Sequence, residues 1–264
     1  MYVCNHFLVL AKSAKIVRNL IKGGADPNKA SANGLTPLFI AAKQGSYLTA
    51  KELLKSPLTN PNMKTIDGST ALLVSIAADH VDVATLLLDH NADPNIAHED
   101  GLSPLMIASQ KTQKDVVELL IKYGAKIDRT TNTGETALMF AAVSDSTVMV
   151  DFLLSLNANV NQQNDFGYTP VMLASSRGSI ASVKKLLEAG ADIEMRDISD
   201  RTVFEILVDR SASVEVLNTL LIYGADNRRR SYITITPAVL AKKEEMMKKL
   251  DEIRINKQRT VKDL

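Results

Sequence analysis

The chain has 264 residues, of which 45% are hydrophobic and 23% are charged, and its formal net charge is +1. These proportions are typical of a folded protein and exclude the low-hydrophobicity, high-charge composition of disordered chains. The only cysteine, Cys4, excludes an internal disulfide framework and zinc sites built from several cysteines. We therefore expect a reducing compartment, namely the cytoplasm, with the nucleus as the alternative.

The first segment, residues 1–31, predicts a partial repeat that caps the N-terminal end of an array or forms the cut edge of a longer one. Its apolar stretch, Val3 to Ala11, lacks a charged region before it and is interrupted by Asn5 and His6, which disfavours a signal peptide. No stretch of the chain approaches the ~20 apolar residues that a membrane-spanning helix needs.

A period of 33 residues organises the chain from this segment onward. The tripeptide Thr36-Pro37-Leu38 returns, with substitutions, at intervals of 33 or 34 residues that begin at Thr70, Ser103, Thr136, Thr169, Thr202 and Thr236. Glycine stands two places before the tripeptide in the first five copies, and Asp200 stands there in the sixth. The glycines are Gly34, Gly68, Gly101, Gly134 and Gly167. An apolar pair such as Leu87-Leu88 and a turn such as Asn91–Asn95 share this period. Three signals with one period indicate tandem repeats.

Each copy predicts two helices and a loop. Thr or Ser followed by Pro or Ala is typical of a helix start, because the hydroxyl accepts from a free amide and Pro has no amide to leave unpaired. A second apolar stretch at helical spacing ends at Gly or Asn, which tolerate a left-handed cap. One such copy cannot bury its apolar faces alone, so neighbouring copies must stack.

These motifs, Thr-Pro-Leu near the start of a copy and Gly-Ala-Asp near its end, resemble the ankyrin repeat family. The resemblance implies an all-α solenoid of stacked antiparallel helix pairs with projecting hairpin-like loops. It implies six repeats over residues 32–226, at about 32–65, 66–98, 99–131, 132–164, 165–197 and 198–226.

Two departures from the family pattern lead to further predictions. The family commonly has His after Thr-Pro-Leu, but this chain has Phe39, Leu73, Met106, Met139, Met172 and Glu205. We expect apolar contact to replace an inter-repeat hydrogen bond there. Between the two helices the family has Gly, and Thr112 and Ser211 stand at that place in two copies. Since Thr and Ser adopt the left-handed conformation less readily than Gly or Asp, we expect altered turns at these two places.

The C-terminal segment, residues 227–264, has eleven Lys or Arg against five Asp or Glu, a net charge of +6. We interpret it as a basic capping helix and tail, because acids alternate with bases along the helical part. The alternative is an electrostatic contact with nucleic acid, an acidic partner or an anionic membrane.

Nothing in the sequence indicates catalysis. The four His residues are not at metal-ligand spacing, and the chain has neither a phosphate-binding loop nor a nucleophile elbow. We therefore expect no catalytic residue, cofactor, metal or small-molecule substrate, and we interpret the chain as a non-enzyme. The alternative is that it is a non-catalytic fragment of a larger enzyme.

The resemblance instead implies a monomeric scaffold or adaptor that binds another protein along a concave surface of loop tips and first helices. The variable places on this surface are Leu35, Lys43, Gln44, Ser69, Glu99, Asp100, Leu102, Gln110, Lys111, Asn132, Glu135, Asp165, Phe166, Tyr168, Arg177, Arg201 and Arg210. Phe166 and Tyr168 flank a turn glycine, where a core role is hard to build, and aromatic residues and Arg are enriched at interface hot spots. Two interpretations of Phe166, Tyr168 and Arg177 stay open. They anchor a partner protein, or their exposure is incidental.

Overall fold

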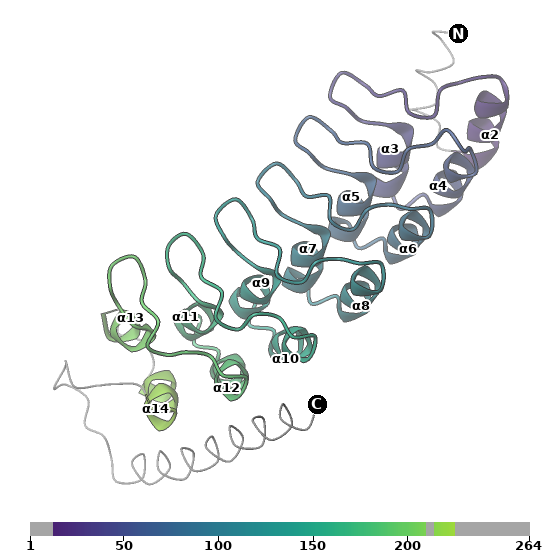
Figure 1. The fold of residues 1–264 in the computed structure, drawn as a ribbon. Helices are drawn as coiled ribbons and strands as arrows, with labels where there is room; N and C mark the ends of the chain where they lie inside the picture. Colours follow the sequence, from purple (N-terminus) through teal and green to yellow (C-terminus); the bar gives the residue numbers. More distant parts are fainter. Residues whose placement is uncertain (1–12, 210–213, 225–264) are drawn as a thin grey trace, which may run out of the picture. The chain divides into compact units, whose positions relative to one another are not determined.

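The structure, a computed structural model, describes residues 13–209 and 214–224. Within these ranges it contains thirteen α-helices joined by loops and no β-strand, so the predicted all-α class is confirmed. The chain divides into two compact units, residues 1–137 and 138–264. Each unit repeats one motif, in which a short first helix, a tight turn and a second helix are followed by a projecting loop (Figure 1).

The described part of the first unit begins with a second helix, which three helix pairs follow. The helices are α2 (Ala14–Lys22), α3 (Pro37–Lys43) with α4 (Tyr47–Leu54), α5 (Ala71–Ala77) with α6 (Val81–Asp89), and α7 (Pro104–Gln110) with α8 (Lys114–Lys122). The first helices α3, α5 and α7 pack side by side, and the second helices α2, α4 and α6 form a neighbouring layer (Figure 1). The order of the helices in space follows the period of the sequence.

The second unit has the same construction. Its helices are α9 (Ala137–Val143) with α10 (Thr147–Ser155), α11 (Pro170–Ser176) with α12 (Ile180–Glu188), and α13 (Val203–Asp209) with α14 (Val214–Ile222). Here α12 packs between α10 and α14, and α11 packs against α13. Stacked antiparallel helix pairs, as the resemblance implied, are thus present in both units.

The helix starts follow the predicted capping chemistry. The Thr36 hydroxyl accepts a hydrogen bond from the amide of Phe39 at 3.1 Å. At the corresponding place in α7, the Ser103 hydroxyl accepts from the Met106 amide, and the thioether sulfur of Met106 accepts from the Ser103 amide, both at 3.3 Å. In α13 the carboxylate of Glu205 takes the role of that sulfur. In α7 and α13, the side chain of the residue after the Thr-Pro-Leu motif therefore helps to cap the helix.

The prediction of apolar contact at the family's His place is confirmed for the five apolar side chains. All five are buried: Phe39, Leu73, Met106, Met139 and Met172. Leucines and small alanines of the same first helices are also buried, for example Leu38 and Ala41 in α3. Burying each such side chain stabilises the fold by about 1.5–3 kcal/mol.

The prediction of an altered turn at Thr112 is wrong. Thr112 has a φ of 59°, close to the 63° of Gly45 at the same place in another copy. The following amide, that of Gln113, donates to the carbonyl of Ala108 at 2.9 Å, so the turn closes in the usual way. Packing of the two helices overrides the local preference of Thr, at a strain of roughly 1–2 kcal/mol. Ser211 lies outside the described residues.

Hydrogen bonds from one side chain also join neighbouring copies. This side chain belongs to the last residue of the turn Asn91–Asn95 and of the equivalent turns in other copies. The Asn95 amide group donates to the carbonyl of Gly124 at 2.9 Å, and its oxygen accepts from the amide of Lys126 at 2.9 Å. The same pair of bonds, which we call the asparagine clasp, is made by three other residues, Asn28, Asn62 and Asn161. Because both bonds reach the backbone of the next copy, the clasp sets the spacing between copies in each unit.

Several predictions fall on residues that the structure does not describe. These are residues 1–12 of the N-terminal segment, Arg210, and the basic segment 227–264 with its proposed contact to nucleic acid or membrane. In the described part of the chain, none of the helices combines the length and the apolar character that crossing a membrane requires.

Candidate protein-binding surface

The projecting loops end in five-residue tips that backbone hydrogen bonds and one side chain hold in shape. In the second unit, the amide of Asn164 donates to the carbonyl of Tyr168 at 3.1 Å. The side-chain oxygen of Asn164 accepts from the amides of Phe166 and Tyr168, at 3.1 and 2.9 Å. Asp197 accepts from the amides of Ser199 and Arg201 in the same way. Asp67 and Asp100, at the third tip place, each accept from one amide, that of the last tip residue.

Neighbouring tips in each unit are joined by backbone hydrogen bonds, which we call the tip ladder. In the first unit the amides of Ile66, Glu99 and Asn132 donate to the carbonyls of Asn33, Asp67 and Asp100, at 3.3, 3.1 and 2.8 Å. In the second unit the amide of Ile198 donates to the carbonyl of Phe166 at 3.1 Å. The ladder uses only the main chain. It therefore places the tips in a row whatever residue types they carry.

The glycine of each tip permits this close approach. Gly101 has a φ of +88°, and a Cβ atom there would lie 2.6 Å from the backbone nitrogen of Asn132. A side chain at this place would therefore meet both the left-handed backbone penalty and a main-chain clash. The ladder explains why glycine recurs two residues before the capping Thr or Ser in five copies, and Asp200 takes the same left-handed conformation, with a φ of 59°, in the sixth.

The tips of the first unit carry three exposed carboxylates and one exposed apolar side chain, that of Ile66, which is 75% exposed. Asp67, Glu99 and Asp100 are exposed, and His98 lies between two of them. Its Nδ1 is 2.9 Å from Oδ1 of Asp100, and its Nε2 is 3.7 Å from Oδ2 of Asp67. The hydrogen bond with Asp100 raises the pKa of His98 above its ordinary value of 6.5. This part of the surface is therefore acidic, with a histidine that the carboxylates help to keep protonated.

The predicted binding residues of the first unit lie on the tips or at the ends of the first helices. Seven are exposed (Lys43, Gln44, Glu99, Asp100, Gln110, Lys111 and Asn132), and four are half-buried (Leu35, Ser69, Leu102 and Glu135). Two of them also join neighbouring copies. Lys111 Nζ donates to the carbonyl of Ala77 and to Asp79, and the Asn132 amide donates to the carbonyl of Glu99.

The second unit presents a different set of tip side chains. Phe166 is 50% exposed, and its ring centroid lies 6.4 Å from that of the half-buried Tyr168. Across the tip ladder stands Ile198, which is 72% exposed and which sequence reasoning missed. We call Phe166, Tyr168 and Ile198 the apolar tip patch. The sequence could have indicated that Ile198 lies on a tip, because it stands two residues before Asp200. Glu99 stands at the same place before Gly101.

The other predicted residues of the second unit have different surroundings. Asp165 and Arg177 are exposed, and Arg177 stands at the end of α11. The Arg201 guanidinium binds Asp197 at 2.7 Å, and the side chain of Asp197 is only 1% exposed. Arg201 therefore neutralises a buried carboxylate, which gives it a structural role in its own loop.

Among the described residues, no three His, Cys, Asp or Glu side chains are grouped so that they could hold a metal ion. The surface is instead made of loop tips with variable side chains on a repeated backbone.

Comparison with protein families connects this construction to known proteins. A model of three ankyrin repeats matches residues 6–98, 49–131 and 92–164, and a model of many ankyrin repeats matches residues 153–207. The chain is 36% identical over 84 residues to alpha-latrocrustotoxin-Lt1a of Latrodectus tredecimguttatus, and 31% identical over 77 residues to human Rabankyrin-5. These stretches cover 32% and 29% of this chain and 6% of each relative, so the chain spans only a small part of their length.

Solved structures show the same fold. The ankyrin repeat domain of Bcl-3, a member of the IkappaB protein family, has a TM-score of 0.72 at 26% identity and covers 82% of this chain and 96% of its own. An ankyrin repeat domain from Acinetobacter baumannii has a TM-score of 0.66 at 28% identity, covering 72% and 98%. The human ASB11 ankyrin repeat domain, at 22% identity, has a TM-score of 0.69 and covers 84% and 98%.

Proposed function

This chain belongs to the ankyrin repeat family, and we propose that it is a scaffold or adaptor that binds a partner protein along its loop tips and first helices. Ankyrin repeats are generally protein–protein interaction modules and are typically non-catalytic. The observation that carries the proposal for this chain is the apolar tip patch in the second unit. We infer that Phe166 and Tyr168 anchor the partner and that Arg177 supports them.

The tip needs none of these side chains to keep its shape. Asn164 and the left-handed Gly167 hold the backbone, and the tip ladder uses the carbonyl of Phe166 rather than its ring. An aromatic ring and an isoleucine that stay exposed on a tip therefore have apolar area available for a partner. Burial of such groups at the centre of an interface gives the residues that contribute most of the binding free energy.

A quantitative binding experiment tests this anchor. A partner is captured with the wild-type chain, identified, purified and titrated by calorimetry against wild type and the triple variant Phe166→Ala, Tyr168→Ala and Arg177→Ala. Loss of an interface anchor costs about 2 kcal/mol or more, so we expect affinity to fall roughly thirtyfold. A single Ile198→Ala variant tests the added member of the patch and should weaken binding less.

The matched control is the double variant Val148→Ala and Val214→Ala. These two valines are as exposed as the apolar tip patch, but they lie on the second helices α10 and α14 of the same unit. The control should bind as wild type does. Unchanged affinity in the triple variant would remove the anchor from the proposal.

A further inference from the structure

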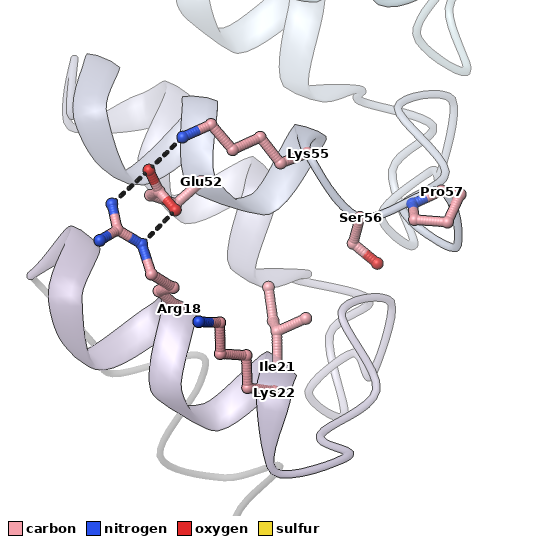
Figure 2. Close-up of a pocket in the computed structure, with 7 residues that line it drawn as sticks. All are labelled: Arg18, Ile21, Lys22, Glu52, Lys55, Ser56 and Pro57. Atoms are coloured by element: carbon pink, nitrogen blue, oxygen red, sulfur yellow. Dashed lines mark hydrogen bonds and ion pairs between the residues drawn. The ribbon is translucent and has the colours of Figure 1, made fainter.

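A hollow of about 380 Å³ lies between α2 and the end of α4, in the layer of second helices of the first unit. Its lining residues are Arg18, Ile21, Lys22, Glu52, Lys55, Ser56 and Pro57 (Figure 2). We call it the basic hollow. It is built from second helices and the turn after α4, whereas the proposed partner surface is built from loop tips and first helices.

A network of charged side chains on one wall makes the basic hollow positively charged. The Arg18 guanidinium donates twice to the Glu52 carboxylate, both at 2.8 Å, and Lys55 Nζ donates to the same carboxylate at 2.6 Å (Figure 2). The hydrogen bonds from Arg18 and Lys55 lower the pKa of Glu52 to about 2. Two cations therefore share one ionised carboxylate, and Lys22 adds a third cation. The basic hollow keeps a net positive charge next to the apolar side chains of Ile21 and Pro57.

The positive charge extends around the basic hollow and then ends abruptly. Lys15 on α2 and Lys51 on α4 are also exposed. Residues 13–58 hold seven Lys or Arg against two Asp or Glu, whereas residues 59–137 hold six against eleven. The next second helix, α6, contains no Lys or Arg and exposes Asp82 and Asp89. Among the described second helices of the first unit, α2 and α4 therefore carry this cationic area and α6 does not.

We propose that the basic hollow binds a short acidic segment of a partner protein. Carboxylates of the segment would approach Lys22, Lys55 and the guanidinium of Arg18, and an apolar side chain between them would contact Ile21 and Pro57. Charge complementarity of this kind directs association and orients the bound chain.

The size of the cationic area favours a peptide over larger polyanions. A helix of eight or nine residues is about 13 Å long, which matches roughly four residues of an extended strand. A nucleic acid or a flat anionic membrane that covers α2 and α4 would also meet the carboxylates Asp82 and Asp89 on α6. A short peptide avoids that repulsion.

The test uses the full chain and a fluorescein-labelled octapeptide of the sequence Glu-Asp-Leu-Glu-Asp-Leu-Glu-Asp, followed by fluorescence anisotropy at low and physiological salt. Lys22→Glu should weaken binding by about tenfold, because it reverses a charge beside the peptide carboxylates. The matched control is Lys122→Glu. Lys22 and Lys122 are both exposed and both end nine-residue helices, α2 and α8. The control should change the affinity by less than about twofold, because its charge lies outside the hollow.

Three results would overturn the proposal: no saturable peptide binding, an equal loss in Lys22→Glu and Lys122→Glu, or tighter Lys22-dependent binding of phosphatidylserine vesicles or a single-stranded oligonucleotide. Circular dichroism verifies that the variants are folded, and Lys22→Gln, which only neutralises the charge, should give a smaller loss. The triple variant at Phe166, Tyr168 and Arg177 should bind the octapeptide as wild type does. The outcome is therefore separate from that of the proposed function.

Discussion

The loop tips of the two units have the same backbone and different side chains. In both units an Asp or Asn side chain holds the tip, and a main-chain amide donates to the neighbouring tip. The exposed tip places of the first unit carry Ile66, Asp67, Glu99 and Asp100. Those of the second unit carry Asp165, Phe166 and Ile198. The tips of the first unit thus present mainly carboxylates and one isoleucine, and those of the second present an aromatic ring opposite an isoleucine.

This difference shows how the repeat separates folding from recognition. The tip ladder needs a glycine, or another left-handed residue, and a free amide and carbonyl. The ladder makes no demand on the side chains on either side of that residue, where Asp67 and Asp100 add only one hydrogen bond each to their own tips. Those places can therefore change from copy to copy at little cost in stability, and differences between tips indicate differences in what each tip contacts.

The largest effect should come from breaking the shared backbone. Gly101→Ala adds a Cβ atom 2.6 Å from the nitrogen of Asn132, at a φ of +88°. We expect the free energy of unfolding to fall by about 2–4 kcal/mol, the sum of the left-handed penalty and the displacement of a neighbouring tip. Urea denaturation monitored by circular dichroism measures the loss.

The control for this change is Gly124→Ala. Gly124 has a nearly equal φ of +86°, but a Cβ atom there has no other atom within 4 Å. Its loss should be about 1 kcal/mol, from the backbone penalty alone. Equal losses at the two glycines would show that the close approach of the tips contributes nothing to stability.

The asparagine clasp is the next shared feature to break, and the two units should respond alike. Asn95→Ala in the first unit and Asn161→Ala in the second each remove one donor and one acceptor to the backbone of the next copy. Each should lower the free energy of unfolding by about 1–2 kcal/mol in urea denaturation. Asn95→Asp keeps the acceptor and loses the donor, so it should give an intermediate loss. If Asn161→Ala had no effect, the two units would not share this support.

The helix pairs could be predicted from the sequence because their signals are local. A Thr or Ser cap, a Pro or Ala after it and an apolar pair a helix length later lie within one copy, and the structure has helices at those places. Thr112 shows the limit of local reasoning. Its turn preference is local, but packing of α7 on α8 decides its conformation.

Features that join different copies could not be predicted in the same way. The asparagine clasp, the tip ladder and the basic hollow each depend on residues about 30 apart that meet only after the copies stack. Ile198 was missed, as was Ile66, because the exposure of a side chain two places before the left-handed residue depends on the neighbouring tip. Arg201 was predicted as a surface contact, but its partner Asp197 is buried within the same loop.

The acidic character of the first unit's tips can be measured at His98. Asp100→Asn removes the main cause of the raised pKa of His98, so an NMR titration should show that pKa fall toward 6.5. Because the folded-state pKa of His98 is raised, its contacts stabilise the fold below the unfolded value and are lost as the pH rises through the folded value. In the variant, this dependence of unfolding on pH should weaken. A His98 pKa that stays raised would point to Asp67 or Glu99 as the main cause.

The smallest effect on stability should come from exchanging the tips themselves. Phe166→Asp with Ile198→Glu gives the second unit the residues that one copy of the first unit has at the corresponding places, Asp100 and Glu99. Both replaced side chains are at least half exposed, and the backbone bond between Ile198 and Phe166 remains possible. The free energy of unfolding should therefore change by no more than about 0.5 kcal/mol, as for other surface substitutions. A loss well above that value would mean that the apolar tip patch supports the fold, and its exposure would then no longer argue for a partner.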